Sequence, residues 1–287
     1  MKGDPRDVRD RLDEARKAVD AELERLLAGD ESRLFEAMRY AVVGRGKRFR
    51  PLLLLAAGGA FGTPREALLP YACAIELIHN YSLVHDDLPS MDNDDFRRGK
   101  PSCHKAFGEG LAVLAGDGLL SLAFEVIAGA PSPRGNGERK EQAFLEIAAA
   151  AGVRGMIKGQ WMDISLSRGE ADGNVYTDLV GRKTGALITA SVKAGALLAG
   201  APPGGVEAAG AYGESVGLAF QLRDDLADSG TTGSPSGLDA VTIFGRDGAR
   251  ARLDECLKKA LAALDRGNVD SAELRCLAGM LAPEPGD

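Results

Sequence analysis

Two acidic clusters restrict what this chain can fold into, because each follows an apolar helical run. The first lies within residues 81–101 and leads into Arg97 and Arg98, and the second lies far down the chain within residues 220–228. Their acids are Asp86, Asp87, Asp92, Asp224, Asp225 and Asp228. Hard divalent cations such as Mg²⁺ take oxygen ligands, usually a few carboxylates with water and substrate phosphate. The clusters therefore predict a multi-metal site, and the arginines suit an anion whose charge the metals do not fully cancel.

The rest of the chain is patterned for helices. Residues 6–27 repeat apolar side chains at steps of three and four, as an amphipathic helix does. Thr63 and Pro64 suit an N-cap and first turn. Further helices are expected over 31–43, 51–61, 64–86, 111–128, 138–166, 205–228, 247–265 and 270–281, with one more interrupted at 181–185. Because no run of alternating β-branched residues and no 20–50-residue repeat occurs, we predict an all-α fold with residues 1–287 in a single domain.

Composition excludes several classes of protein. The net charge of −7 and a pI of about 5.2 argue against a nucleic-acid binder, which needs a basic face. The first thirty residues lack the apolar centre of a signal peptide, and the longest apolar run, 52–61, is short of the roughly 20 residues of a membrane span. Four scattered cysteines without a CxxC pair indicate reduced thiols. We expect a cytoplasmic protein with no membrane span.

The second cluster has a simple helical geometry. Gln221, Asp224, Asp225 and Asp228 stand at i, i+3, i+4 and i+7, so they share one stripe of a helix. Like charges at this spacing repel each other, so a cation must compensate them. The alternative is a solvated acidic face, although acids at a helix C-terminus oppose the helix dipole. The apolar residues that precede the cluster favour metal binding.

In the first cluster, Pro89 ends the helix, so we expect a loop that folds Asp92 back toward Asp86. His79 lies nearly two turns before Asp86 and therefore on the same helix face. A lone histidine on an apolar helix is more often a core residue than a ligand. Its alignment with the carboxylates makes the two interpretations about equally strong.

Basic residues surround glycines in two further places. Lys47, Arg48 and Arg50 precede a helix start, where free backbone N–H groups and the helix dipole suit a phosphate. The alternative is a solvated basic loop, and the segment is not a Walker A loop. Lys183 and Thr184 lie between Gly181 and Gly185 and give the same kind of signal, which is weak by itself.

Together these features match a family. The chain resembles the trans-isoprenyl diphosphate synthases (polyprenyl synthetases), most closely the bacterial short-chain enzymes that make farnesyl or geranylgeranyl diphosphate. The resemblance runs from about Arg39 to Asp228. It rests on five motifs in order: GKRFRP at 46–51, HNYSLVHDDLPSMDNDDFRRGKP at 79–101, AGDGLL at 115–120, GRKTGAL at 181–187 and FQLRDDLAD at 220–228.

The resemblance implies a homodimer in which a bundle of long helices surrounds a deep central cleft, with three Mg²⁺ ions per active site held by the six aspartates. Isopentenyl diphosphate would bind Lys47, Arg50, His79 and Arg98. The allylic diphosphate would bind Arg97, Lys183 and Gln221, with Thr184 beside the reacting carbons. The groups closest to the chemistry would be Asp86, Asp87, Asp92, Lys183, Thr184 and Asp224.

Product length is expected to depend on what blocks the cleft floor. Tyr81 lies five residues before Asp86, about 7.5 Å back along the helix axis, and Ser82 is its neighbour. In similar bacterial farnesyl synthases a tyrosine at this place limits the product, whereas the alternative is a plain core aromatic. We favour a C15 product, with C20 as the alternative.

The chain departs from the family pattern after the second cluster. The family carries a lysine there, but residues 229–239 contain none and the next is Lys258; Ala227 also replaces a common leucine. This departure motivates an alternative, a weakly active or non-catalytic partner subunit. A terpene cyclase is less favoured, because it would carry an Asn/Ser/Glu metal motif in place of the second aspartate cluster.

Overall fold

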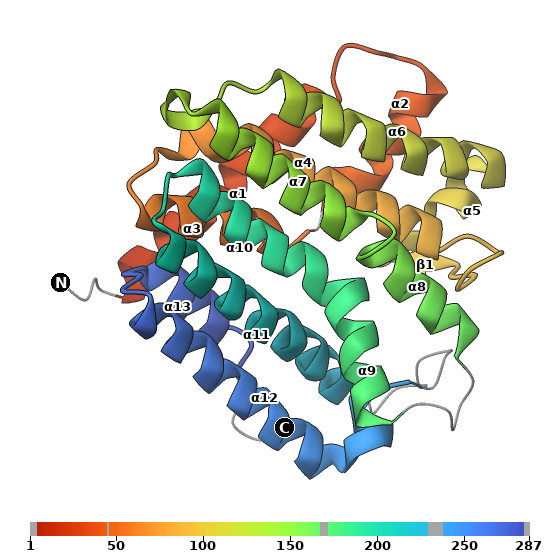
Figure 1. Cartoon of the computed structure of the whole chain (residues 1–287). Helices are drawn as coiled ribbons and strands as arrows, with labels where there is room; N and C mark the ends of the chain where they lie inside the picture. The colour runs from red at the N-terminus through yellow and green to blue at the C-terminus, as the bar shows by residue number, and fades with distance from the viewer. Residues whose placement is uncertain (1–4, 45, 167–171, 229–237, 284–287) are drawn as a thin grey trace.

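Helices make up nearly all of the structure, a computed structural model that describes residues 5–44, 46–166, 172–228 and 238–283 (Figure 1). The helices are α1 (Pro5–Leu26), α2 (Arg33–Val42), α3 (Phe49–Ala60), α4 (Arg65–Asp86), α5 (Cys103–Phe107), α6 (Glu109–Gly129), α7 (Gly137–Ala151), α8 (Met156–Ser165), α9 (Gly173–Val180), α10 (Ala186–Leu198), α11 (Pro203–Asp228), α12 (Ala240–Arg266) and α13 (Ala272–Gly279). Short 3₁₀ and π turns, η1 (Pro133–Gly135) and η2 (Gly181–Gly185), complete the helical elements. The all-α prediction is confirmed.

Helix α10 lies at the centre of the bundle. It packs against α3, α7 and α11, while α4 joins α3 to α6 and α12 covers α11 (Figure 1). Small residues allow the helices to approach closely: a Cβ added at Gly195 would stand 2.3 Å from the backbone oxygen of Leu54. Because α10 is apolar on nearly every side, it is buried on nearly every side.

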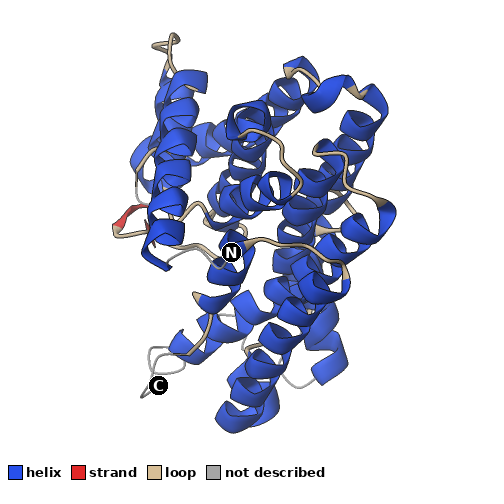
Figure 2. Cartoon of the chain, turned by 90° about the vertical axis from the view of Figure 1, so that its left-hand side faces the viewer, coloured by secondary structure: helices blue, strands red, loops and turns tan. Residues whose placement is uncertain are grey.

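The structure corrects three details of the predicted elements. The expected helix 138–166 is two helices, α7 and α8, because a Cβ at Gly155 would collide with the carbonyl of Ala150, and only glycine allows that reversal. Thr63 does not cap α4; its hydroxyl accepts from Arg134, and Pro64 occupies the cap position. A two-residue hairpin of β1 (Phe96–Arg97) and β2 (Lys100–Pro101) follows the first acidic cluster, the small red element in Figure 2.

The interruption predicted at 181–185 is a π-helical turn, η2, between α9 and α10. Such turns occur frequently at functional sites. The turn contacts α8 and α11, and a Cβ at Gly217 of α11 would stand 2.7 Å from the Cα of Gly185. Close packing therefore places Lys183 and Thr184 beside α11.

Among the helices of the described residues, α6 alone is long and apolar enough to cross a membrane by length and composition. The sequence predicts this helix over 111–128, but Asp117 and several glycines interrupt its apolar residues. About a third of its most apolar window is buried, and it packs on α4, α2 and α5. One such helix is weak evidence for a span, because buried helices of globular proteins pass the same test. All four cysteines are free thiols, and Cys73, Cys103 and Cys256 are buried.

Candidate active site

The first acidic cluster is built by the end of α4 and the loop that follows it. Asp86 is the last residue of the helix, and the backbone N–H of Asp92 donates to the carbonyl of Asp86 at 2.9 Å. The loop thus folds Asp92 back as predicted. Asp87 is buried and accepts from the guanidinium of Arg97, which also donates to Asp94 at 2.9 Å.

Lys183 brings the π turn to this cluster. Its ammonium donates to Asp163 of α8 at 2.5 Å and is also attracted by Asp86 and Asp92. Burial pulls the pKa of Lys183 down, but these carboxylates outweigh burial and raise it. Asp163 is a site residue that sequence reasoning did not select, although its position three residues after Gln160 on one helix face could have signalled it.

Burial is the main influence on the carboxylates of the first cluster. It raises the pKa of Asp86 to about 7; Asp92 and Asp87 push it the same way, and Lys183 and Arg97 oppose them. The pKa values of Asp87 and Asp92 are also raised, again chiefly by burial. Burial therefore disfavours the charged forms of these carboxylates, and the nearby cations do not fully offset that cost.

The second cluster joins the same turn from α11. The hydroxyl of Thr184 donates to Gln221 Oε1 at 3.0 Å, and Gln221 Nε2 donates to Asp225 at 2.8 Å. Asp225 is buried and also accepts from the Tyr176 hydroxyl at 2.7 Å and the Ala240 backbone N–H at 2.8 Å. These contacts satisfy the Asp225 carboxylate within the protein. The turn η2 therefore lies between the two acidic clusters: Lys183 is attracted by Asp86 and Asp92 of the first, and Thr184 is linked through Gln221 to Asp225 of the second.

The other two acids of the second cluster, Asp224 and Asp228, are more exposed than Asp225. Asp224 is partly buried, and burial raises its pKa, while Lys47 opposes that rise. Asp228 is exposed at the end of α11. Asp224 also attracts the buried guanidinium of Arg50, so the basic residues around the start of α3 lie within electrostatic reach of α11.

The other predicted cations lie around the start of α3 and the end of α4. Arg50 stands 5.7 Å from the Phe220 ring centroid and 3.4 Å from Nε2 of His79. Arg98 is exposed and its Nη1 lies 3.5 Å from the Asn80 side-chain oxygen. Burial lowers the pKa of Arg50 to about 10 and the pKa of His79 well below 6.5. Arg50 stays charged at neutral pH, whereas His79 is neutral.

A cavity of about 260 Å³ opens beside the first cluster. Asp86 and Lys183 line it together with apolar and aromatic side chains of α4 and α8, among them Tyr81 and Trp161; Ser82 lines it too. Both polar atoms of the Gln160 amide are buried here, with no hydrogen-bond partner among the residues whose positions are described. Since buried amides are nearly always bonded, this orphaned group suits a polar ligand atom. Gln160 is a further site residue that the sequence analysis did not select.

The donor set fits a hard divalent cation. The side chains are carboxylates, and because burial disfavours the charged forms of Asp86 and Asp92, an added cation would stabilise those charged forms. In the part of the chain that is described, no three Asp, Glu, His or Cys side chains come together as a ready-made metal site. Mg²⁺ typically completes its coordination with water and substrate phosphate, so the carboxylates suit Mg²⁺ bound together with a diphosphate.

Comparison with known proteins gives one consistent answer. The polyprenyl synthetase family matches residues 31–241. A farnesyl diphosphate synthase of Geobacillus stearothermophilus is 39% identical, over 94% of this chain and 96% of that protein. A chloroplastic geranylgeranyl pyrophosphate synthase of Catharanthus roseus is 42% identical, over 75% of this chain and 62% of its own length. The solved apo structure of an FPP/GFPP synthase from Zymomonas mobilis superposes with a TM-score of 0.87 at 36% identity, covering 96% of this chain and 99% of that one.

The raised pKa of Asp86 predicts a pH-dependent gain in stability for Asp86→Asn. Between its usual 3.8 and about 7 the folded protein binds this proton more tightly than the unfolded chain, so the group's contribution to stability falls as pH rises through that range. Asp86→Asn removes the cost of burying the ionised group. In urea unfolding without metal, we expect the variant's gain over wild type to be about 1–2 kcal/mol larger at pH 8 than at pH 5.

Asp95→Asn is the matched control. Asp95 lies in the same loop, is exposed and pairs with Lys105, so its replacement should show no comparable pH dependence. Equal gains for Asp86→Asn at the two pH values would contradict a raised Asp86 pKa.

Proposed function

The chain belongs to the polyprenyl synthetase family, and on this basis we propose that it is a short-chain prenyltransferase that condenses dimethylallyl or geranyl diphosphate with isopentenyl diphosphate. The observation that carries the proposal is the position of η2 between the two aspartate clusters: Lys183 pairs with Asp163 and is attracted by Asp86 and Asp92, and Thr184 donates to Gln221, which donates to Asp225. The apolar cavity beside Asp86 and Lys183 would hold the growing prenyl chain.

The side chains divide into two anion-binding groups in this proposal. Lys183, Arg97 and Gln221 bind the allylic diphosphate, while Lys47, Arg50, His79 and Arg98 bind isopentenyl diphosphate. The acids of both clusters would hold Mg²⁺, three ions by family resemblance, which supplies Lewis-acid stabilisation of the leaving diphosphate. Asp225 would contribute least directly, because its carboxylate already accepts from Tyr176, Gln221 and Ala240.

The reaction then follows from charge. The cations stabilise the diphosphate as it leaves the allylic carbon, and the isopentenyl double bond attacks the resulting carbocation. A proton is lost to the departing diphosphate. In this proposal the oxygen atoms of Thr184, whose hydroxyl donates to Gln221, orient the reacting carbons. The apolar cavity walls keep water away from the carbocation.

Tyr81 is the residue we propose to limit product length, with Ser82 beside it. Tyr81 is 7% exposed, lines the cavity, packs edge-on against His85 and contacts the Ala151 carbonyl at 3.4 Å through its hydroxyl. This held position suits a barrier, so we propose farnesyl diphosphate (C15) as the product and geranylgeranyl diphosphate (C20) as the alternative.

The loss of the expected lysine after Asp228 supports a second candidate, a weakly active or non-catalytic partner subunit. Most of that segment, residues 229–237, lies outside the described residues. Within the described part, Lys47 and Arg50 both attract Asp224, and Lys183 attracts Asp86. These cations favour the active enzyme.

We further propose that the chain forms a cytoplasmic homodimer and that residues 1–287 make one domain. Contacts between α1 and α13 join the two ends of the described chain. Exposed apolar side chains lie on α6, α7 and α8 and on the turn that joins the last two. They are Val113, Leu114, Leu145, Val153, Ile157, Trp161 and Ile164, and the last three also line the cavity beside Asp86. A surface of this kind suits a second copy of the chain.

The central test removes one acid from each cluster. Asp86→Ala or Asp224→Ala should lower kcat by roughly 100-fold or more with geranyl diphosphate, isopentenyl diphosphate and Mg²⁺, because transition-state charge loses its stabilisation. Circular dichroism should stay helical. Asp95→Ala in the same loop is the control with unchanged turnover. Wild-type turnover in both cluster variants would reject the site assignment, and a wild-type protein that forms no product would favour the partner subunit.

The chain-length proposal predicts a longer product for Tyr81→Ala, because removing the ring opens the cavity. Chromatography of the dephosphorylated products should show C20 prenol or longer. Tyr81→Phe keeps the ring and should retain C15. An unchanged C15 product from Tyr81→Ala would place the barrier elsewhere.

The homodimer proposal predicts a particle of twice the 30.0 kDa chain mass in size-exclusion chromatography with light scattering. Leu145→Glu should shift it toward the monomer, because an exposed apolar residue becomes charged. A wild-type monomer at micromolar concentration would reject the proposal.

A further inference from the structure

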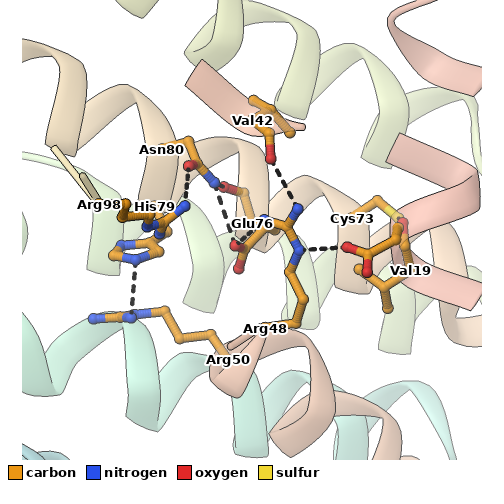
Figure 3. A network of polar contacts seen from close by, with 10 residues as sticks. Val19, Val42, Arg48, Arg50, Cys73, Glu76, His79, Asn80 and Arg98 are labelled. Carbon is orange, nitrogen blue, oxygen red and sulfur yellow. Dashed lines mark hydrogen bonds and ion pairs between the residues drawn. The ribbon is translucent and has the colours of Figure 1, made fainter. Parts of the chain in front are cut away.

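Arg48 lies between Lys47 and Arg50 in sequence, yet its side chain is inside the protein. The residue is 2% exposed and has a left-handed backbone with φ of 51°. Its guanidinium donates to Glu76 at 2.7 Å, to the Val42 carbonyl at 2.8 Å and to Asp20 at 2.7 Å. In Figure 3 the Arg48 guanidinium lies above Arg50 and to the right of His79, with dashed lines to Glu76 and to the Val42 carbonyl. Since all three guanidinium nitrogens are bonded within the protein, Arg48 is not a phosphate ligand, contrary to the grouping suggested by sequence.

Glu76, the acid that Arg48 contacts, is 1% exposed on α4 and lies one turn before Asn80. The Asn80 amide donates to the Glu76 backbone carbonyl at 2.7 Å and to its carboxylate at 3.3 Å. This fixes the orientation of the amide, so its oxygen points to Arg98, whose Nη1 lies 3.5 Å away (Figure 3). Glu76 thus reaches Arg98 through one intermediary.

His79 is held from the other side. Its Nε2 lies 3.4 Å from Nη1 of Arg50. Arginine can only donate, so Nε2 is the acceptor and the imidazole is neutral, with its proton on Nδ1. Arg50 Nε is buried and has no hydrogen-bond partner among the described residues. A donor of this kind suits an anion that arrives from outside.

Three arginines in one place repel each other and need a buried counter-charge. Glu76 is the first-ranking attractive charge acting on each of Arg48, Arg50 and Arg98. Asp224 adds to this for Arg50, but it belongs to the second aspartate cluster. Glu76 is therefore the common anion of the basic group.

We propose that Glu76 is a positioning residue for isopentenyl diphosphate: anchored by Arg48, it holds Arg98 through Asn80 and holds Arg50 by its charge, without touching the substrate itself. The inference rests on the proposed function. The alternative is that Glu76 only neutralises Arg48 and stabilises the fold.

Glu76→Gln separates these roles, because it keeps the side-chain shape and an acceptor oxygen but removes the charge. We expect KM for isopentenyl diphosphate to rise roughly tenfold or more, the range expected when a hydrogen-bonded charge is lost. KM for geranyl diphosphate and kcat should stay within about threefold of wild type. Unchanged KM for isopentenyl diphosphate, or an equal rise for both substrates, would overturn the proposal.

Asp20→Asn is the matched control. Asp20 is the other carboxylate that pairs with Arg48, lies on α1 and is partly exposed. The Asp20→Asn substitution removes the same kind of ion pair, but Asp20 is not linked to Arg50 or Arg98. Both KM values should therefore stay at wild type. A rise in KM for isopentenyl diphosphate equal to that of Glu76→Gln would show that any loss of Arg48 pairing has this effect, and would overturn the proposal.

A second variant guards against loss of folding, because Glu76→Gln leaves a buried arginine underpaired. Replacing a whole buried ion pair by a residue of similar volume is often neutral or stabilising. The double variant Glu76→Gln, Arg48→Met should therefore recover the wild-type Tm. If its KM for isopentenyl diphosphate stays raised, positioning is supported; a return to the wild-type KM would show a role in the fold alone.

Direct binding separates this inference from the proposed function. Isothermal titration of isopentenyl diphosphate without an allylic substrate should give a Kd for Glu76→Gln at least tenfold above wild type. Weakened binding supports the positioning role of Glu76 even if the wild-type protein forms no product. In that case only the proposed function fails. If the wild-type protein turns over and the Kd values of wild type and Glu76→Gln are equal, the positioning role of Glu76 is rejected and the proposed function stands.

Discussion

Compensation of buried charge is the constraint on which this structure depends. Asp86, Asp87 and Asp92 crowd the end of α4, and burial raises the pKa of each. Their attraction to Lys183 and Arg97 partly offsets the cost. Because Lys183 lies on a π turn that also contacts α11 through Thr184, the same interaction that relieves the first cluster fixes its position relative to the second.

Buried charge is also compensated around the start of α3 and the end of α4, where the crowded groups are cations rather than carboxylates. Arg50 and Arg98 lie close to the internal Arg48, and Glu76 attracts all three. The protein thus keeps a cationic group that includes Arg50 near Asp224, and an acidic group that includes Asp86 and Asp92 near Lys183. A substrate pair with two diphosphates and one metal-dependent leaving group suits such an arrangement, because each diphosphate meets a different balance of charge.

Much of this could be predicted from sequence, because helical periodicity and local motifs depend on neighbouring residues. The all-α class, most helix bounds and the interruption at 181–185 follow from the spacing of apolar residues and glycines, and the family follows from the resemblance of five sequence motifs. The break at Gly155 was missed, because it depends on a backbone reversal that needs glycine rather than on apolar spacing. The partners of Lys183 and the orphaned amide of Gln160 were also missed, since their contacts involve residues distant in the chain.

By itself, the sequence determined that the chain is helical and which charged groups it carries, because period and composition are properties of the chain. Only the tertiary structure decided what each group does. Arg48 and Arg50 are two residues apart in one basic motif, yet Arg48 is bonded to Glu76, Asp20 and Val42 inside the protein, while Arg50 keeps a buried Nε without a partner among the described residues. The physical reason is that position in the sequence determines only where a side chain leaves the backbone. The groups that it contacts belong to helices from distant parts of the chain, which tertiary packing brings close.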